Sequence, residues 1–378
     1  MRVLLIAHTY IVRINQKKVQ ELASIPNMHL RVIVPKTWPE LTHSTIRVES
    51  PIQANFSFCA LPTVLAGDGG KYFYRTVDLT MRGFKPDVVH IEESPRGLAT
   101  FQAALYKRVW SPNARFVFFT WANLERPLPR PLYVFERFNI AQTDHAICGN
   151  QDAARLLRTK GFQRPISVIP QLGIDTGVFH PRDGTDLRQR LDLAPQTFVI
   201  GFAARMVPEK GLLMLIEAVA HLTGDWTLLL IGKGPDRGLA LQRAQALGIG
   251  HRVRMVDPVP HLEFAPYLNV MNVLVSPSLT TATWKEQFGL AVAQAMASQV
   301  PVVGSLCGET PNLIGNAGLL FREGDVSALS DCLRRLQADP ALCTDLGRLG
   351  VERIRAHFTF RSIAERTYQV WEGLVNGP

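Results

Sequence analysis

Two cations follow a buried, strand-like run in the second half of the chain. Arg205 and Lys210 stand on either side of the turn in GFAARMVPEKG, residues 201–211, after the apolar run Val199–Ala203. Arginine offers a planar fork of donors and lysine a point charge, so the pair suits a diphosphate at the carboxyl end of a strand. Taken alone, the same segment also fits a solvated loop with an incidental lysine.

A glutamate precedes an apolar segment with helical character. Glu286 follows the strand-like run NVLVSPS and a Thr-rich loop, and Phe288, Gly289 and Leu290 then open the helix in TWKEQFGLAVAQAMA, residues 283–297. The first N–H groups of a helix lack intrahelical partners and carry the positive end of its dipole, so they can hold an anion. Glu286 is either a site residue or a helix N-terminal charge, and its spacing alone favours the second reading.

Two glycines come directly after a third apolar run. The segment Ile231-Gly232-Lys233-Gly234-Pro235 begins like the G-x-G-x-x-G dinucleotide motif, but Arg237 stands at the last glycine position. Glycine has no Cβ, so close backbone approach to a ligand stays open here. The sequence contains no G-x-x-x-x-G-K-[ST] segment, which excludes a P-loop kinase or NTPase.

Short apolar runs must position these groups. Candidate strands are Val3–Ala7, Leu30–Val34, Val88–Ile91, Phe116–Thr120 and Ala146–Cys148, then Val199–Ala203, Thr227–Ile231, Val253–Val256, Val273–Val275 and Val302–Gly304. Runs this apolar, with amphipathic segments between them, are typical of parallel strands that helices cover on both faces. Two such sets predict two doubly wound α/β domains, with a ligand-binding cleft between their strand ends.

Length and composition agree with this organisation. The chain has 378 residues, of which 47% are apolar and 19% charged, enough for two or three domains with large cores. We expect a first domain at 1–165, a second at 166–354, and a helical tail, 355–378, that packs back on the first. No run reaches the ~18 apolar residues of a membrane span. Five scattered cysteines argue against a disulfide framework or structural zinc and favour a reducing cytosol.

Positive charge concentrates in the first half. Residues 1–180 hold 22 Lys and Arg against 13 Asp and Glu, whereas residues 181–378 hold 19 of each. The segment ERPLPRPLYVFERF, residues 125–138, interleaves arginine with proline and aromatic residues. This pattern fits contact with anionic lipid headgroups, and equally ordinary solubilising charge or a Pro-rich loop packed on its own domain.

In order and spacing these segments resemble the retaining GT-B glycosyltransferases of family 4. The matching features are R-x4-K at Arg205 and Lys210, the GKGP turn, and VLVSPS leading to an E-x7-E-like box at Glu286. PVVGSLCGETPNLI and VIPQLGIDTGVFHP complete the set. The resemblance covers the second half and, more weakly, the first.

The resemblance implies a GT-B fold of two Rossmann-like domains and a nucleotide-sugar donor site in the second. Arg205 and Lys210 would neutralise the diphosphate, the amides of Phe288, Gly289 and Leu290 would hold its distal phosphate, and Glu286 would bind the sugar hydroxyls. Gln294 would face the ribose. The remaining nucleotide-side candidates are Gly232, Lys233, Gly234 and Pro258. Members of the family transfer with retention and without a metal or other cofactor, and the sequence has no Asp-x-Asp.

Two single residues and two segments depart from the family pattern. Gln294 replaces the second glutamate of the box, so it keeps acceptor and donor atoms but loses a charge-assisted hydrogen bond, which predicts weaker nucleotide binding or a changed nucleoside preference. Gln299 stands where the family usually has glycine. The Gly-rich loop after the first strand is replaced by AHTYIVRINQKK, and FFTWANLE lacks the family's histidine, for which Asn123 is the nearest polar substitute.

The candidates on the acceptor side come from the first half. His8, Asn15 and Lys17 are candidates for the role of the missing loop, whereas Lys18 is expected on the exposed face of a helix. His90 ends the strand of DVVHIEES, with Glu92 and Glu93 behind it. A histidine with carboxylates at a strand's carboxyl end suits acid–base chemistry or acceptor orientation, and equally a histidine bonded to a neighbouring loop.

The leading interpretation is a retaining, metal-independent hexosyltransferase. It would move a hexose from a nucleotide-diphosphate sugar to a saccharide, lipid-linked or small-molecule acceptor, in the cytoplasm or peripherally at the inner membrane face. The alternatives are a non-catalytic sugar-nucleotide-binding GT-B subunit and a GT-B sugar-nucleotide epimerase, which the E-x7-Q box speaks against. Nucleic-acid binding is a distant possibility, because no recognition motif accompanies the basic half.

Overall fold

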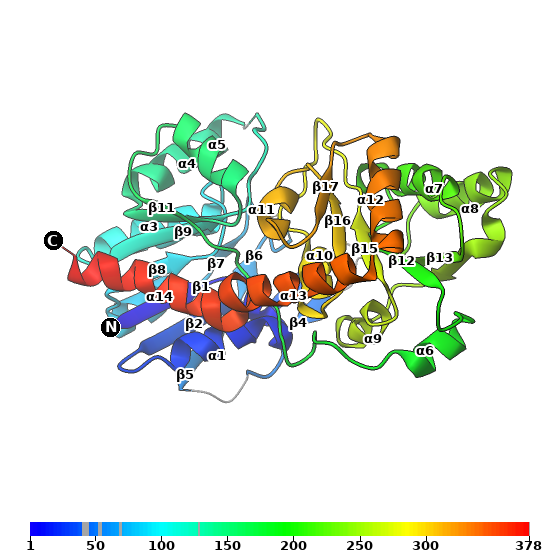
Figure 1. Cartoon of the computed structure of the whole chain (residues 1–378). Coiled ribbons are helices and arrows are strands. Elements are labelled where there is room, and N and C mark those ends of the chain that lie inside the picture. The colour runs from blue at the N-terminus through cyan, green and yellow to red at the C-terminus, as the bar shows by residue number, and fades with distance from the viewer. Residues whose placement is uncertain (40–44, 52–54, 68–69, 128, 378) are drawn as a thin grey trace. The chain divides into compact units, whose positions relative to one another are not determined.

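The computed structural model describes residues 1–39, 45–51, 55–67, 70–127 and 129–377, which form two compact α/β units (Figure 1). Unit 1 comprises Met1–Gly173 with Phe360–Pro378, and unit 2 comprises Ile174–Thr359. The boundary lies later than the expected 165, because residues 166–168 add a strand to the sheet of unit 1. Residues 355–357 end a helix of unit 2, and the helix that packs on unit 1 begins at Phe360.

A parallel sheet forms the centre of unit 1, in the strand order β11-β10-β9-β8-β1-β2-β5. Its strands are β1 (Arg2–Ile6), β2 (His29–Pro35), β5 (Phe56–Leu61), β8 (Val88–Ile91), β9 (Arg115–Thr120), β10 (His145–Cys148) and β11 (Ile166–Val168). Two antiparallel hairpins accompany it: β3 (Thr37–Pro39) with β4 (Thr45–Arg47), and β6 (Thr63–Val64) with β7 (Phe73–Tyr74). The chain leaves β1 toward β2 and returns on the other side as β8, so the strand order reverses between β1 and β8.

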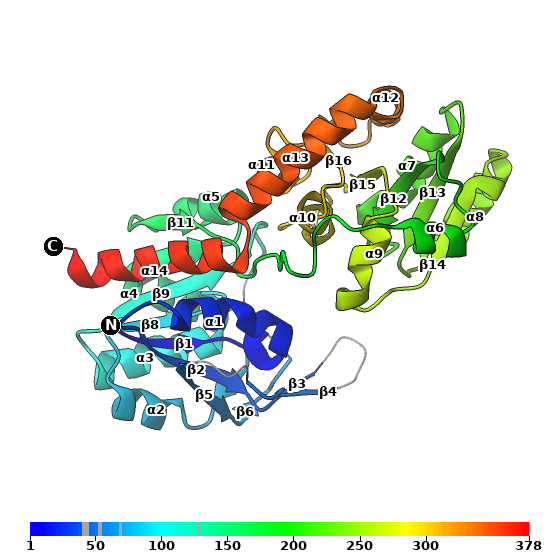
Figure 2. The ribbon, with the colours of Figure 1, turned by 60° about the horizontal axis from the view of Figure 1, so that its bottom comes forward.

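Helices cover both faces of this sheet. Apolar side chains of α2 (Val77–Phe84), α3 (Leu98–Trp110) and α5 (Gln151–Thr159) fill one core. Those of α1 (Lys17–Ala23) and α14 (Phe360–Asn376) fill the other, and these two helices pack against each other (Figure 2). Helix α4 (Arg130–Gln142) packs on α3. The five strands expected in the first half are all confirmed.

Unit 2 repeats the architecture with the strand order β14-β13-β12-β15-β16-β17. Its strands are β12 (Phe198–Ala203), β13 (Trp226–Ile231), β14 (Val253–Val256), β15 (Val273–Ser276), β16 (Val302–Ser305) and β17 (Leu319–Phe321). All described pairs are parallel, and the five strands expected here are confirmed. The order reverses between β12 and β15.

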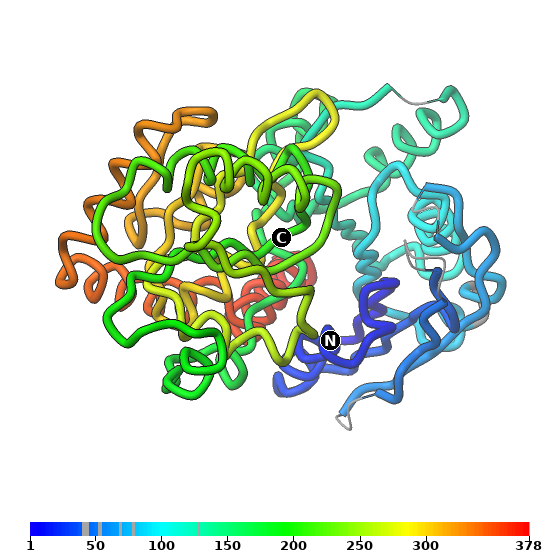
Figure 3. The backbone as a smooth tube through the Cα atoms, turned by 90° about the vertical axis from the view of Figure 1, so that its right-hand side faces the viewer, coloured from blue at the N-terminus to red at the C-terminus, as the bar shows by residue number. Residues whose placement is uncertain are grey.

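Two apolar layers sandwich the sheet of unit 2, and Figure 3 traces the backbone that forms them. One layer is built on α7 (Leu212–Ala220), α8 (Asp236–Ala246) and α12 (Val326–Ala338). The other uses α6 (Thr185–Arg190), α9 (Phe264–Leu268), α10 (Leu290–Ala297), α11 (Thr310–Ile314) and α13 (Pro340–His357). Among the described residues, no helix combines the length and the apolar character needed to cross a bilayer.

Candidate functional site

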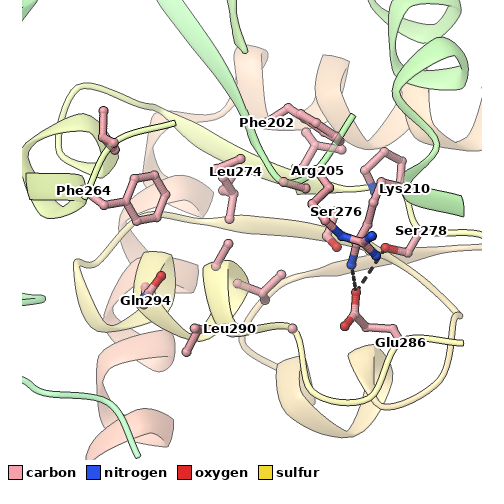
Figure 4. Close-up of a pocket in the computed structure, with 18 of the residues that line it drawn as sticks. Phe202, Arg205, Lys210, Phe264, Leu274, Ser276, Ser278, Glu286, Leu290 and Gln294 are labelled. Carbon is pink, nitrogen blue, oxygen red and sulfur yellow. Dashed lines mark hydrogen bonds and ion pairs between the residues drawn. The ribbon is translucent and has the colours of Figure 1, made fainter. Parts of the chain in front are cut away.

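A cavity of about 600 Å³ opens in unit 2 at the carboxyl ends of β12 and β15. This is where the strand order reverses, the place at which doubly wound sheets bind ligands. Of the predicted donor-site residues, six line the cavity: Arg205, Lys210, Glu286, Gly289, Leu290 and Gln294. Figure 4 shows Lys210, Ser278 and Glu286 together, with Phe264 and Gln294 at the far end.

The charged end is organised around Lys210 and Glu286. Lys210 Nζ lies 2.6 Å from Glu286 Oε2, and Ser278 Oγ donates to the same carboxylate at 3.3 Å. Lys210 Nζ also lies 4.4 Å from the centre of the Trp284 ring, close enough for a cation–π contact. Both charged side chains are largely buried, whereas that of Arg205 is 64% exposed and lies 3.5 Å from the Glu209 carboxylate. An anion entering this end meets one buried cation, Lys210, and one exposed cation, Arg205.

Backbone geometry fixes the position of Lys210. Pro208 begins a short 3₁₀ helix that ends at Lys210, and Gly211 follows with a φ of 67°. A Cβ on Gly211 would stand 1.9 Å from the carbonyl oxygen of Pro277, so only glycine lets this turn pack on the loop after β15. Leu279 N–H donates to the Glu209 carbonyl at 2.8 Å and ties the two loops together.

The loop after β16 supports the main chain of Glu286, which itself lies in the loop after β15. Glu309 N–H donates to the Glu286 carbonyl at 3.1 Å, and a Cβ on Gly308 would lie 2.0 Å from that oxygen. The GETPNLI segment of the sequence therefore supports the main chain of Glu286 through a glycine and an amide. Glu286 is buried and paired with Lys210, so it is not a solvated charge at the start of a helix, and its role toward a donor sugar stays a prediction.

Helix α10 directs its first turn into the cavity. Gly289, with a φ of 91°, precedes the helix, and the residues from Gly289 to Val292 all line the cavity. Their N–H groups belong to the part of a helix that has no carbonyl four residues earlier within the helix, so they are available to an anion. Phe288 does not line the cavity; its ring packs in the core, 6.0 Å from Phe358.

The opposite end is apolar apart from one polar pair. Phe202, Phe264 and Leu274 contribute its walls, and Gln294 Nε2 lies 3.3 Å from Nδ1 of His261. Burial lowers the pKa of His261, which Asp175 partly opposes, so the neutral ring can accept from the amide. Sequence reasoning missed His261, since it lies on a loop that carries no motif signal.

The GKGP turn packs against the loop that carries Arg205 and does not line the cavity. The cavity is not lined by Gly232, Lys233, Gly234 or Pro258. From the loop that contains Pro258, Val259 and His261 line it instead. A Cβ on Gly232 would lie 2.0 Å from the Ala204 carbonyl oxygen, and one on Gly234 2.1 Å from that of Met206. The two glycines therefore allow the turn to pack against the Arg205 loop, and their contact with a nucleotide stays a prediction.

In unit 1, Glu92 belongs to a buried network. It accepts hydrogen bonds from Lys18 Nζ at 2.5 Å, Tyr10 Oη at 2.6 Å and Gln171 Nε2 at 3.2 Å. Burial alone would raise the pKa of Glu92, but Lys18, with smaller contributions from His90 and the Tyr10 hydrogen bond, outweighs it and the pKa is lowered. The expectation that Lys18 is exposed is wrong: its side chain is 2% exposed, because it neutralises Glu92 inside the unit.

The neighbouring carboxylate, Glu93, meets His8 instead. His8 Nδ1 lies 2.5 Å from Glu93 Oε1, and the ring stacks on Trp38 with centroids 4.4 Å apart. Burial lowers the pKa of His8, but Glu93 and, to a smaller extent, Glu92 together more than offset this and the pKa is raised. Asn15 donates from Nδ2 to the Thr9 carbonyl at 2.8 Å, which makes it a support of the loop after β1.

His90 is inaccessible to solvent. It is fully buried below α14, 5.5 Å from the ring of Trp371, and neither ring nitrogen has a hydrogen-bond partner within the part of the chain that the structure describes. Burial lowers the pKa of His90 to about 3. The predicted role of His90 in acid–base chemistry is therefore corrected to that of a neutral core residue. Asn123 lies in the loop after β9, half-buried, and its predicted role stays a prediction.

The geometry agrees with what the sequence shares with known proteins. Residues 197–339 match the family described as glycosyl transferases group 1. The D-inositol 3-phosphate glycosyltransferase 1 of Catenulispora acidiphila is 30% identical over 255 residues, which cover 63% of this chain and 59% of that protein. The MMP alpha-(1->4)-mannosyltransferase of Mycolicibacterium hassiacum is 34% identical over 215 residues, 56% of this chain and 49% of that one. The chain thus spans about half to three-fifths of these relatives' length.

Solved structures are similar over the whole chain. Sucrose-phosphate synthase from Thermosynechococcus elongatus has a TM-score of 0.70 at 20% identity, covering 100% of both chains. Anabaena HepE in complex with UDP has a TM-score of 0.74 at 16% identity, covering 99% of this chain and 100% of that one. Such likeness shows the fold. The chain therefore has the predicted GT-B fold of two Rossmann-like α/β units, and its residues 197–339 are similar to the group 1 glycosyltransferases.

Proposed function

We propose that the chain is a retaining, metal-independent glycosyltransferase that takes a hexose from a nucleotide-diphosphate sugar. The observation that carries this is the gathering of Arg205, Lys210, Glu286 and the first turn of α10 around one cavity. Its charged end suits a diphosphate and its apolar end a nucleoside. HepE has been solved with UDP and with UDP-glucose, which supports a donor of this class.

In this proposal the bond between the sugar C1 and the diphosphate oxygen breaks as an acceptor oxygen bonds to C1 from the same face. The leaving diphosphate gains negative charge, which Lys210, Arg205 and the N–H groups of α10 stabilise most in the transition state. The acceptor's proton passes to the departing phosphate oxygen, so the step balances without a metal. Glu286 binds the hydroxyls of the donor sugar, and Gln294 binds the ribose.

The acceptor in this proposal is a saccharide, a lipid-linked or a small-molecule hydroxyl compound, bound by residues of unit 1. One relative is named a D-inositol 3-phosphate glycosyltransferase, which supports a small polyhydroxylated acceptor. We further propose a cytoplasmic location, with peripheral contact at the inner membrane face. Tyr133 and Val134 of α4 are more than half exposed beside Arg130 and Arg137, which supports that contact. Sedimentation with anionic vesicles should decrease at high salt and in the Tyr133→Ser/Val134→Ser double variant.

The experiment has two steps. A thermal-shift panel of UDP-, GDP- and ADP-sugars identifies the donor, because a ligand that binds only the native state raises its melting temperature. NMR of the reaction with that donor then follows its consumption and the anomeric configuration of the product. Retention of configuration supports the proposal. Nucleotide binding without any donor consumption across diverse acceptors would favour the non-catalytic subunit, and conversion of the donor into an epimer would favour the epimerase.

A further inference from the structure

Unit 1 has its own strand-order reversal, between β1 and β8, and two polar residues follow it. His8 comes shortly after the end of β1 and Glu93 shortly after the end of β8. Loops at the carboxyl ends of strands at such a reversal are where doubly wound sheets bind ligands. The histidine and the glutamate therefore occupy, within unit 1, the topological position that the Arg205 loop and Ser278 occupy within unit 2.

Glu93 fixes the orientation of His8. The carboxylate Oε1 accepts from His8 Nδ1–H at 2.5 Å and from the His8 backbone N–H at 3.0 Å. Glu93 is buried, whereas the His8 side chain is 33% exposed. Among the described residues no hydrogen-bond partner of His8 Nε2 is found, so a carboxylate on Nδ1 leaves Nε2 as the nitrogen open to a ligand.

An aromatic wall stands beside this histidine. The Trp38 ring stacks on His8 at 4.4 Å with an interplanar angle of 17°, and Tyr72 meets Trp38 edge-on at 4.8 Å. Trp38 follows β2, the strand on the other side of β1, so three neighbouring strand ends supply the cluster. A few polar atoms set in an aromatic surface are typical of small-molecule sites.

A second carboxylate, Glu92, anchors the loop after β1 next to this pair. Glu92, with Lys18, Tyr10 and Gln171, already ties the segment after β1 to β8 through a buried, fully hydrogen-bonded network. Glu93 adds the hydrogen bond from the His8 backbone N–H to this anchoring, whereas the His8 ring is partly exposed. The stacked ring of His8 and its open Nε2 suit recognition of a ligand.

We propose that His8, oriented by Glu93 and flanked by Trp38, binds a hydroxyl of a polyhydroxylated ring, a sugar or a cyclitol, through Nε2. The inference rests on the proposed function, since this ring would be the acceptor. His8 contacts the ring, and Glu93 is a positioning residue that holds the tautomer. Trp38 packs against the C–H face of the ring.

Binding is tested on the full chain by saturation-transfer NMR with methyl α-D-mannopyranoside, methyl α-D-glucopyranoside and myo-inositol. We expect at least one of them to bind, and His8→Ala and Trp38→Ala to weaken that binding about tenfold at an unchanged melting temperature. His29→Ala, an exposed histidine at the start of β2, is the matched control and should bind as the wild type does. The inference is overturned when none of the three compounds binds the wild type, or when His8→Ala binds normally.

Kinetics separate this inference from the proposed function. With the ring compound as acceptor, Glu93→Gln should raise the acceptor KM about tenfold and leave the donor KM unchanged, which a general loss of structure would not do. A wild-type protein that binds the ring but consumes no donor would contradict the proposed function and leave the subsite standing. Transfer with wild-type acceptor KM and kcat in both His8→Ala and Glu93→Gln would contradict the subsite alone.

Discussion

Lys210 Nζ lies 2.6 Å from Glu286 Oε2, across 76 residues of sequence. The two side chains come from loops after β12 and β15, at the reversal of the strand order in unit 2, and both line the cavity. An isolated buried charge is costly, and the Glu286 carboxylate gives the buried Lys210 ammonium a partner beside the first turn of α10. An arriving diphosphate would share that ammonium with Glu286.

Glu286→Gln should separate the two roles of this carboxylate. The amide removes a negative charge next to Lys210, so the nucleoside diphosphate should bind at least as tightly as to the wild type. Loss of a charge-assisted hydrogen bond to the donor sugar should lower kcat roughly tenfold to a hundredfold, from about 1.5–3 kcal/mol. Steady-state kinetics and calorimetry test both points, with the exposed Glu352→Gln as the control. An unchanged kcat would argue that Glu286 does not touch the sugar.

Gln294→Glu should restore the charge-assisted hydrogen bond that the chain lacks at the nucleoside end. We expect donor affinity to rise roughly threefold to tenfold, measured by calorimetry with the preferred nucleotide sugar. The new carboxylate would face His261 Nδ1, 3.3 Å from the present amide nitrogen, and should raise the lowered pKa of that ring. Affinity equal to or below that of the wild type would contradict the assignment of Gln294 to the ribose.

His90 should make the fold sensitive to acid. Burial lowers its pKa from 6.5 to about 3, so the unfolded chain takes up a proton that the folded chain refuses. The contribution of His90 to the free energy of unfolding is therefore complete above pH 6.5. It is lost as the pH falls toward 3, at up to ~1.4 kcal/mol per pH unit.

Urea unfolding between pH 4 and 8 measures this slope, and His90→Gln should flatten it. His145, whose pKa burial lowers to about 4, contributes with the same sign in both proteins and cancels in the comparison. Parallel pH profiles for the wild type and the variant would show that His90 does not carry the effect.

Gln299→Gly should stabilise unit 2. Gln299 has a φ of 62°, a conformation that costs a residue with a Cβ about 1–2 kcal/mol, while the greater freedom of glycine in the unfolded chain offsets part of the gain. The expected net increase in unfolding free energy is about 0.5–1 kcal/mol. Gln242→Gly, at an exposed position inside α8, should instead destabilise by about 1 kcal/mol. An equal loss of unfolding free energy in the two variants would contradict backbone strain at Gln299.

The sequence predicted the strands and the charged end of the cavity because both depend on local signals. Uninterrupted apolar runs mark doubly covered strands such as β12 and β13, and the short spacing of Arg205 and Lys210 places both near one strand end. Strands with weaker patterns were not anticipated, among them β5, an edge strand with mostly half-buried residues, and β11, which moved the boundary between the units.

Partners distant in sequence could not be predicted. Lys18 was expected in solvent, and only the folded chain shows that it lies against Glu92, 74 residues away. The same holds for His90, whose burial depends on Trp371 of the C-terminal helix, and for His261, which pairs with Gln294 across 33 residues. Tertiary packing decides these cases, and periodicity carries no information about it.

The most direct test compares the binding of a nucleoside diphosphate and its monophosphate, by calorimetry, in the wild type, Lys210→Ala and the exposed control Arg334→Ala. The base is the one that the thermal-shift panel selects. We predict that the wild type and Arg334→Ala bind the diphosphate at least tenfold more tightly than the monophosphate, and that Lys210→Ala loses most of this difference. Equal binding of the two nucleotides by the wild type, or an undiminished preference in Lys210→Ala, would contradict a diphosphate held by Lys210 and the start of α10.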